Sequence, residues 1–238
     1  MKKTLLFVFL FFQFFIGLAQ SLPDSSIFSL RAPDSFRVRF QTTTGNFVIE
    51  AHREWGPAGV DRLYQLVRSD FYRDAAIFRV QPDYVVQFGI SPHPEVNTFW
   101  EEHPLPDEPV KKSNLKGTLA YAREGANSRT TQLFINYRDN HKLDTVDFNG
   151  LKGFPPIGRV VEGMEVVQSF CSDYGFEPAE KQDSVYQLGN AYLRENYPGL
   201  DYIKRAKIIK YYSLHSLFGQ GAGNPWFSIL PMELTSPE

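Results

Sequence analysis

Cysteine is almost absent from this chain, with Cys171 the only one in 238 residues. An internal disulfide is therefore excluded, and the fold must be stabilised by its apolar core. Cys171 ends the apolar run 166–171. We expect it to be buried by packing and not to act as a reactive thiol.

An excess of positive charge is also missing. The chain has 25 Lys and Arg against 27 Asp and Glu, a formal net charge of −2. Nucleic-acid-binding proteins need a clustered basic surface. We therefore expect no nucleic-acid partner.

The usual signatures of metal, cofactor and nucleophile sites are missing too. The five histidines do not fall at metal-ligand spacing, so we expect surface positions for them. The Gly-rich segment 219–223 lacks the strand and helix that flank a dinucleotide-binding loop, and no Ser or Cys lies on a nucleophile elbow. We expect no metal and no cofactor. An acidic, Pro-rich cluster is predicted to be a solvated loop and not a catalytic carboxylate pair; it contains Glu101, Glu102, Asp107 and Glu108.

The N-terminus has an apolar run that is shorter than a membrane-spanning helix requires. Lys2 and Lys3 precede apolar residues 5–12 and 14–18, and small residues follow at 17 and 19. This is the pattern of a secretory signal peptide over residues 1–19, whereas a spanning helix needs about 20 apolar residues. An uncleaved anchor is the alternative. We expect an exported protein, periplasmic or extracellular, with no membrane association after signal removal and with a net charge of −4 once Lys2 and Lys3 are gone.

The rest of the sequence is rich in short strand patterns. Residues 36–41 alternate strictly between apolar and polar side chains, and turn residues at 42–46 connect them to a second run at 47–52. Further strands are expected at 76–80, 85–87, 118–122, 133–136, 157–161 and 200–210. Helices are expected after Pro57, over 164–171, and around Val185, Leu188 and Tyr192. Asp61 and Arg62 are expected on the solvent face of the first helix. Many short strands with few helices favour an antiparallel barrel over a parallel sheet.

The domain organisation follows from changes in composition. Residues 20–34 are polar and aperiodic and are predicted to be a leader, and 35–210 to be the folded domain. Residues 211–238 form a C-terminal extension rich in aromatic and aliphatic side chains. Such a segment would leave a large apolar patch in water, so we expect it to pack on the barrel. A docking element for an export-pathway partner is the alternative.

One apolar stretch, 77–89, contains a single cation, Arg79, with Gln87 on the following strand. Charged residues rarely lie in such runs without a partner or a function. A turn at 82–83 would place Arg79 and Gln87 on one sheet face, and a second amide, Gln132, begins another strand. An arginine and two amides beside apolar residues offer no nucleophile, but they can hold a proline ring and hydrogen-bond a peptide. A buried ion pair for Arg79 and ordinary sheet amides for the glutamines are the alternatives.

Four sequence blocks, in order, resemble the cyclophilin family of peptidyl-prolyl cis-trans isomerases. They are Ile77-Phe78-Arg79 with Tyr84-Val85-Val86-Gln87, Gly117-Thr118-Leu119-Ala120-Tyr121-Ala122, Asn127 to Asn136, and Leu143-Asp144 with Phe154 to Met164. The resemblance covers roughly 36–175 and implies a closed, mainly β, antiparallel barrel capped by helices. It also implies a monomer that isomerises X-Pro bonds in unfolded or loop-exposed proteins.

The resemblance assigns roles residue by residue. Arg79 takes the position of the catalytic arginine, with Gln87 and Gln132 as the amides beside it. The backbone of Arg123 takes a peptide-holding position. The remaining substrate-binding positions fall on Tyr84, Val85, Ala122, Phe134, Leu143 and Phe154.

The mechanism implied needs no proton transfer. Rotation about X-Pro breaks amide conjugation, with a barrier of about 18–20 kcal/mol, and the twisted nitrogen gains lone-pair density. A permanent cation aimed at that nitrogen stabilises the twisted form more than the planar one. The rival hypothesis is a non-catalytic module of the same fold that captures Pro-containing peptides.

Three positions depart from the family pattern. Phe88-Gly89-Ile90 replaces a Gly-Gly-Asp turn beside the expected pocket, Lys142 replaces an aromatic residue, and Phe154 replaces a histidine common in eukaryotic members. The first alters a tight turn. The other two are expected to change peptide preference, and Lys142 is also expected to remove a cyclosporin contact.

Overall fold

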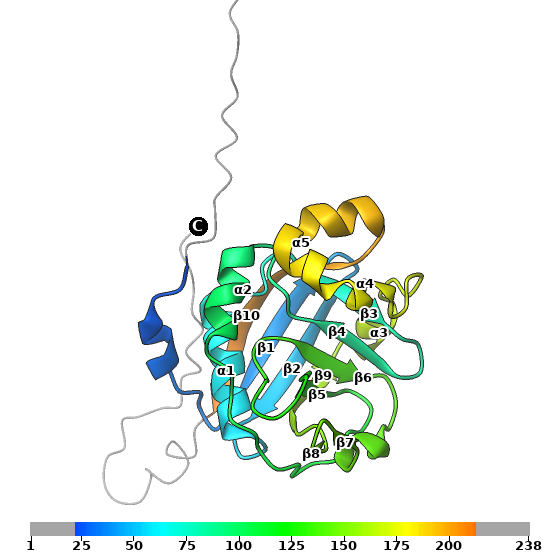
Figure 1. The fold of residues 1–238 in the computed structure, drawn as a ribbon. Coiled ribbons are helices and arrows are strands. Elements are labelled where there is room, and N and C mark those ends of the chain that lie inside the picture. Colours follow the sequence, from blue (N-terminus) through cyan, green and yellow to red (C-terminus); the bar gives the residue numbers. More distant parts are fainter. Residues whose placement is uncertain (1–21, 213–238) are drawn as a thin grey trace, which may run out of the picture.

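The computed structural model describes residues 22–212. Eight of its strands close into an antiparallel barrel in the order β1–β10–β3–β4–β6–β5–β9–β2 (Figure 1). The barrel strands are β1 (Ser35–Thr42), β2 (Asn46–His52), β3 (Ala75–Val80), β4 (Val85–Phe88), β5 (Thr118–Tyr121), β6 (Leu133–Asn136), β9 (Pro156–Glu162) and β10 (Tyr202–Tyr212). A small hairpin, β7 (Asp147–Phe148) and β8 (Leu151–Lys152), lies outside the barrel. The predicted fold class is confirmed.

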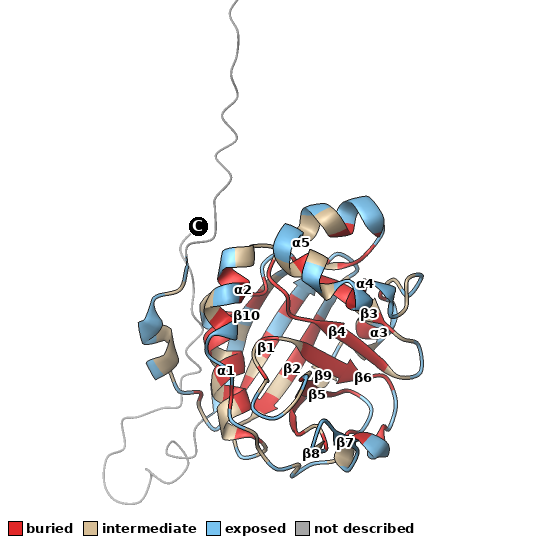
Figure 2. Ribbon diagram, viewed as in Figure 1, coloured by how far each residue is buried: buried red, intermediate tan, exposed pale blue. Residues whose placement is uncertain are grey.

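The barrel closes because its strands carry one apolar face each. In β1 the side chains of Phe36, Val38 and Phe40 are fully buried, while the residues between them are more exposed (Figure 2). A hairpin pairs β1 with β2, so that Phe40 stacks on Phe47 at 4.9 Å between ring centroids. The period-two pattern read from the sequence therefore sets the register of the first two strands.

The helical elements cover the barrel at its ends and sides. They are η1 (Ser25–Ser29), α1 (Pro57–Arg68), α2 (Pro94–Glu101), η2 (His141–Asp144), α3 (Met164–Gln168), α4 (Glu177–Glu180) and α5 (Gln182–Asn196). Both α1 and α2 begin with proline at the first turn, where its missing N–H costs no hydrogen bond. The α2 helix and the hairpin β7–β8 have no counterpart among the expected elements.

Arg62 was expected on the solvent face of α1, and that expectation is wrong. Its side chain is buried and donates to the carbonyl oxygens of His103 (2.6 Å) and Thr130 (3.2 Å). Its guanidinium also lies 5.1 Å from the ring of Trp100 and 5.6 Å from that of Phe28. Segments distant in sequence supply every one of these partners, so helical periodicity alone could not reveal them.

Glu108 is likewise not part of a solvated loop. Its carboxylate accepts hydrogen bonds from the N–H groups of Ala58 and Gly59 in the first turn of α1, at 2.8 and 3.1 Å. It also pairs with Arg129, whose side chain is 1% exposed, at 3.2 Å. An anion at a helix N-terminus satisfies the free amides and complements the helix dipole. The pair Glu108–Arg129 thus joins α1 to the loop before β6.

The segment after Gly175 forms a second, smaller core on the outside of β3. Val185 and Leu193 of α5 are buried in a cluster with Phe78 and Ile90, and α5 appears above β3 and β4 in Figure 1. Leu188, expected on the apolar face of this helix, is instead 59% exposed. The buried positions of this segment are Val185, Gly189, Leu193 and Tyr197, spaced by four, so Leu188 lies beside this face and not on it. The helix is also interrupted at Gly189, whose backbone has φ 60° and ψ −148°.

The remaining expectations concern the chain ends and Cys171. Cys171 is half-buried, less than expected. Tyr211 and Tyr212, counted with the C-terminal extension, belong to β10 and are exposed. The expected signal peptide and residues 213–238 lie outside the described residues. Among residues 22–212, no helix is long and apolar enough to cross a membrane.

Candidate functional site

A cavity of about 970 Å³ opens beside strands β3 to β6. All ten predicted site residues line it: Arg79, Tyr84, Val85, Gln87, Ala122, Arg123, Gln132, Phe134, Leu143 and Phe154. They come from β3, β4, β6, η2 and the connecting loops. The structure thus brings together all ten residues that were predicted to form the site. The role of each one remains a prediction.

Arg79 is held firmly at the edge of this cavity. Its Nε donates to Oε1 of Gln81 (2.9 Å), its Nη2 also reaches that oxygen, and its Nη1 donates to Oε1 of Gln87 (2.9 Å). The guanidinium lies 4.6 Å from the ring of Phe176 and 5.8 Å from that of Tyr84. Since arginine has five N–H donors, two have no partner among the described residues and are available to a peptide.

Strand pairing explains why Arg79 meets Gln87. The two residues are directly opposite in the β3–β4 ladder, as the turn at 82–83 predicts. Gln87 is 5% exposed and donates from Nε2 to Oε1 of Gln132 at 2.7 Å. The three polar side chains therefore form a continuous hydrogen-bonded row.

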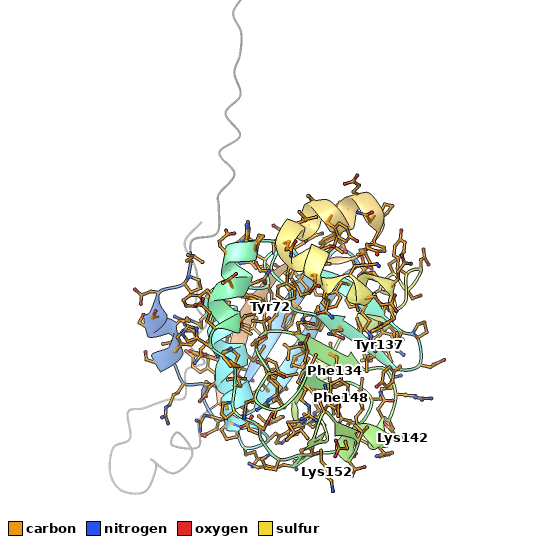
Figure 3. All side chains as sticks on the ribbon, in the orientation of Figure 1. Tyr72, Phe134, Tyr137, Lys142, Phe148 and Lys152 are labelled. Atoms are coloured by element: carbon orange, nitrogen blue, oxygen red, sulfur yellow. The ribbon has the colours of Figure 1, made fainter. Side chains whose placement is uncertain are left out.

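An apolar subsite lies next to this row. Val85, Phe134 and Leu143 are buried in one cluster, with Phe154 packed against it. The rings of Phe134 and Phe154 meet edge to face at 5.8 Å, an arrangement favoured for aromatic pairs. Figure 3 shows Phe134 above Phe148 of β7 on this side of the molecule. A small apolar ring such as that of proline suits these walls.

Arg123 supports the far wall of the cavity. Its guanidinium lies 4.5 Å from the ring of Phe154, and its Nη2 donates to the carbonyl of Leu151 in β8. Its side chain is buried. This contact fixes the hairpin β7–β8, whose Phe148 and neighbouring Val146 form part of the rim. Gln132 O accepts from the N–H of Ala122 at 3.0 Å, which completes the floor.

The altered turn 88–90 does not enter the cavity. Phe88 packs against Phe40 and Tyr72 in the barrel core, and Ile90 belongs to the outer core. Gly89 has φ 111°, and a Cβ there would lie 2.5 Å from the Thr131 carbonyl oxygen, so glycine is required. Lys142 is exposed, and it does not line the cavity.

Arg79 is a charged group at the edge of a cavity that carboxylates also line. Burial lowers the pKa of Arg79, with a smaller opposing effect from Tyr84, but a guanidinium stays protonated at neutral pH. The described residues lining the cavity include no His or Cys. Between residues 22 and 212, no group of three or more His, Cys, Asp or Glu side chains could hold a metal. Hydroxyl groups of Ser128 and Thr130 line the cavity, but no histidine among the lining residues is placed to activate them. The arrangement is suited to binding and polarising a peptide.

Sequence reasoning missed the part of the site contributed by α2, α4 and α5. Phe176 covers Arg79, Gln182 and Tyr186 contact Gln132, and Glu101 lies at the rim. The only available signal was the i, i+4 spacing of Gln182 and Tyr186, which puts them on one helix face. Nothing in that spacing tells where the helix docks.

Comparison with known proteins identifies the relatives of this chain. The family described as cyclophilin type peptidyl-prolyl cis-trans isomerase/CLD matches residues 37–187. Peptidyl-prolyl cis-trans isomerase A of Dickeya dadantii is 32% identical over 75% of this chain and 87% of its own length. A peptidyl-prolyl cis-trans isomerase of Acinetobacter baylyi is 29% identical over 61% and 77%.

Solved structures agree on the fold. A crystal structure of a cyclophilin type isomerase of Cryptosporidium parvum superposes with a TM-score of 0.53 at 18% identity, covering 75% of this chain and 99% of that one. A second crystal structure of that protein was obtained in the presence of the dipeptide Ala-Pro.

Proposed function

Since this chain belongs to the cyclophilin type peptidyl-prolyl cis-trans isomerase family, we propose that it acts on X-Pro bonds through Arg79 and assists the folding of exported proteins. The observation that carries the proposal is the fixed orientation of Arg79 beside an apolar subsite. A proline ring enters the subsite formed by Val85, Phe134 and Leu143, and the preceding amide then lies at the row of polar side chains.

Arg79 stabilises the twisted amide. Two of its N–H groups remain free after Gln81 and Gln87 have fixed the guanidinium. As the X-Pro bond rotates, the nitrogen loses conjugation and becomes an acceptor, so a donor aimed there binds the transition state better than the planar states. Because Gln81 and Gln87 hold the guanidinium before substrate arrives, little reorganisation is needed during rotation.

The cellular role rests on the N-terminal sequence. Residues 1–19 have the features of a signal peptide, and uncatalysed prolyl isomerisation takes about 10–100 s. Proteins that fold after export face the same slow step as those that fold before it. N-terminal sequencing of the protein secreted by a bacterial host should find Gln20 at the start, and a full-length chain retained in the membrane fraction would contradict the export proposal.

The experiment that tests the activity separates an enzyme from a binding module. Catalytic amounts of the purified protein are added to a short Ala-Pro peptide, and cis–trans exchange is followed by NMR exchange spectroscopy. An isomerase increases the exchange rate in proportion to enzyme concentration. Peptide chemical-shift changes on binding, without faster exchange, would mean that the chain only captures Pro-containing segments.

A further inference from the structure

The row of polar side chains continues beyond the residues assigned to the reaction. Arg79 donates to Gln87 (2.9 Å), and Gln87 donates to Gln132 (2.7 Å). Gln132 in turn donates both N–H groups to α5, to Oε1 of Gln182 at 2.7 Å and to the hydroxyl of Tyr186 at 2.9 Å. The chain of donors therefore runs from the barrel into a helix that lies outside it.

The direction of every bond in this chain is dictated from the Arg79 end. Arginine has no acceptor, so the carbonyl oxygen of Gln87 must face it and the amide nitrogen of Gln87 must face Gln132. The carbonyl oxygen of Gln132 then faces Gln87, and both of its N–H groups face α5. A flipped amide at either glutamine would set donor against donor. Gln132 consequently needs acceptors at α5 to remain in this orientation.

A carboxylate on a third element lies near the end of this chain. Glu101, the last residue of α2, lines the same cavity as Tyr186, and each side chain shifts the pKa of the other. Burial raises the pKa of Glu101, and hydrogen bonding with Tyr186 lowers it in part. At the tyrosine, burial raises the pKa most, the bond from Gln132 lowers it, and Glu101 raises it. The hydroxyl accepts from Gln132 and keeps its own proton to donate toward Glu101.

The helix that carries Tyr186 is fixed to the same strand as Arg79. Val185 packs with Phe78, the residue preceding Arg79, in the outer core. Asn190 donates from Nδ2 to the carbonyl of Asp74 at 2.7 Å, just before β3 begins. The two ends of the hydrogen-bond chain are thus joined through the backbone as well as through side chains.

We propose that Tyr186, oriented by Glu101, is a positioning residue that holds Gln132 and, through Gln87, the guanidinium of Arg79. A row of hydrogen bonds from a cation to an anion polarises each member in the same sense. The inference rests on the proposed function, because its kinetic consequence is a loss of isomerase activity. Tyr186 acts through Gln132 in this scheme and is not itself a catalytic residue.

The test is Tyr186→Phe, which keeps the ring that packs against the outer core and removes only the hydroxyl. We expect kcat for an Ala-Pro peptide to fall about three- to tenfold, the equivalent of one neutral hydrogen bond, with KM and the melting temperature unchanged. Tyr192→Phe is the matched control, since Tyr192 lies on the same helix and contacts Tyr197 outside the cavity. It should keep wild-type kinetics.

Two further comparisons distinguish positioning from a structural effect. In a Gln132→Leu background, Tyr186→Phe should cause no additional loss, because the residue through which it acts is gone. Glu101→Gln, which retains an acceptor for the hydroxyl, should stay near wild type, whereas Glu101→Leu should reproduce Tyr186→Phe. Equal losses in both backgrounds, or a kcat for Tyr186→Phe within twofold of wild type, would overturn the proposal.

A spectroscopic readout keeps this proposal separate from the proposed function. The side-chain amide NMR signals of Gln132 should shift in Tyr186→Phe and remain in place in Tyr192→Phe. If the wild-type protein fails to isomerise the peptide, the proposed function falls, and the positioning chain is judged on these signals alone. Unmoved signals in Tyr186→Phe would refute it.

Discussion

At the scale of the single residue, Arg79 combines a positive charge, a fixed orientation and two N–H groups without a partner among the described residues. Its neighbours Gln81 and Gln87 take three of its N–H groups, and two aromatic rings lie over its plane. A lysine would present a point charge without this fork geometry. The mechanism proposed for the site therefore requires arginine and not merely a positive charge.

Arg79→Ala is expected to lower kcat/KM by about 10²–10³-fold, comparable with the loss of one transition-state donor. Arg159→Ala, at an exposed position on β9, removes the same charge away from the cavity and should leave kcat/KM unchanged. Both variants are compared by peptide exchange kinetics and circular dichroism. Near-wild-type turnover by folded Arg79→Ala would refute the mechanism.

Residues with distant partners show where sequence reasoning stops. Arg79, Gln87 and Gln132 could be placed because strand parity and the motif resemblance locate them locally. Arg62 and Glu108 could not, because apart from Gln65, which contacts Arg62, their hydrogen-bond and ionic partners lie 21 or more positions away in sequence. A charge in a polar loop or on a helix looks solvated until the segment that covers it is known.

Glu108→Ala is expected to destabilise the protein by about 3–5 kcal/mol, since it leaves Arg129 buried without its ionic partner. It also removes the acceptor from the first turn of α1. Glu102→Ala, an exposed member of the same acidic cluster, should change the free energy of unfolding by less than about 0.5 kcal/mol. Urea unfolding measures both, and equal values would contradict the buried pair.

At the scale of the element, the barrel strands could be predicted from the sequence, whereas helix α2 and the position of helix α5 could not. The alternation in β1 identifies that strand by its period, and short apolar runs identify β3 to β6 by their length and the turn residues around them. The α2 helix could have been inferred from Pro94 at its start, but its mixed sequence hides the pattern. The position of α5 could not be inferred, because helical spacing says nothing about which surface a helix covers. The sequence therefore could not reveal that Gln182 and Tyr186 of α5 and Glu101 of α2 join Arg79, Gln87 and Gln132 at the site.

Gly189→Ala is expected to loosen α5. A Cβ at this position would overlap the Pro92 carbonyl oxygen, and the backbone conformation there is one that only glycine adopts readily. Gly175→Ala is the matched control, with positive φ but open space around it. We expect the Gly189 variant to lose more unfolding free energy than the control, and to show reduced kcat as Tyr186 moves. Equal melting temperatures would indicate that α5 adjusts without cost.

At the scale of the whole molecule, the fold is a closed barrel whose cavity combines a guanidinium, amides and apolar rings with carboxylates. Burial lowers the pKa of Arg79 from a strongly basic value, so this side chain stays charged at neutral pH. Burial raises the pKa of Glu101, but a protonated Glu101 would still offer Tyr186 an acceptor, as Glu101→Gln does. The Arg79 guanidinium is protonated throughout the range below its pKa, so the role proposed for it would persist from acid to neutral solution.

Isomerase activity is therefore expected to be flat between about pH 6 and 8 and unaffected by EDTA. The measurement is kcat/KM by NMR exchange at three pH values, with and without chelator, using circular dichroism to confirm that the fold is constant. A bell-shaped profile would indicate a titrating acid or base that the site does not contain. Inhibition by EDTA would indicate a required metal.

Residues 22–34, which precede the first barrel strand, pack on the helices and so belong to the folding unit. Phe28 stacks against Phe99 and His103 and shares Arg62 with Trp100, while the amide of Gln65 donates to the carbonyl of Leu30 at 3.0 Å. A polypeptide truncated to start at Ser35 would keep every barrel strand but lose the contacts of Phe28 and Leu30 with α1. The side chains of Arg62 and Gln65, which are buried in the whole chain, would then be exposed to water on that side. We therefore expect the smallest fragment that folds with full resistance to proteolysis to start ahead of Phe28, well before the first strand.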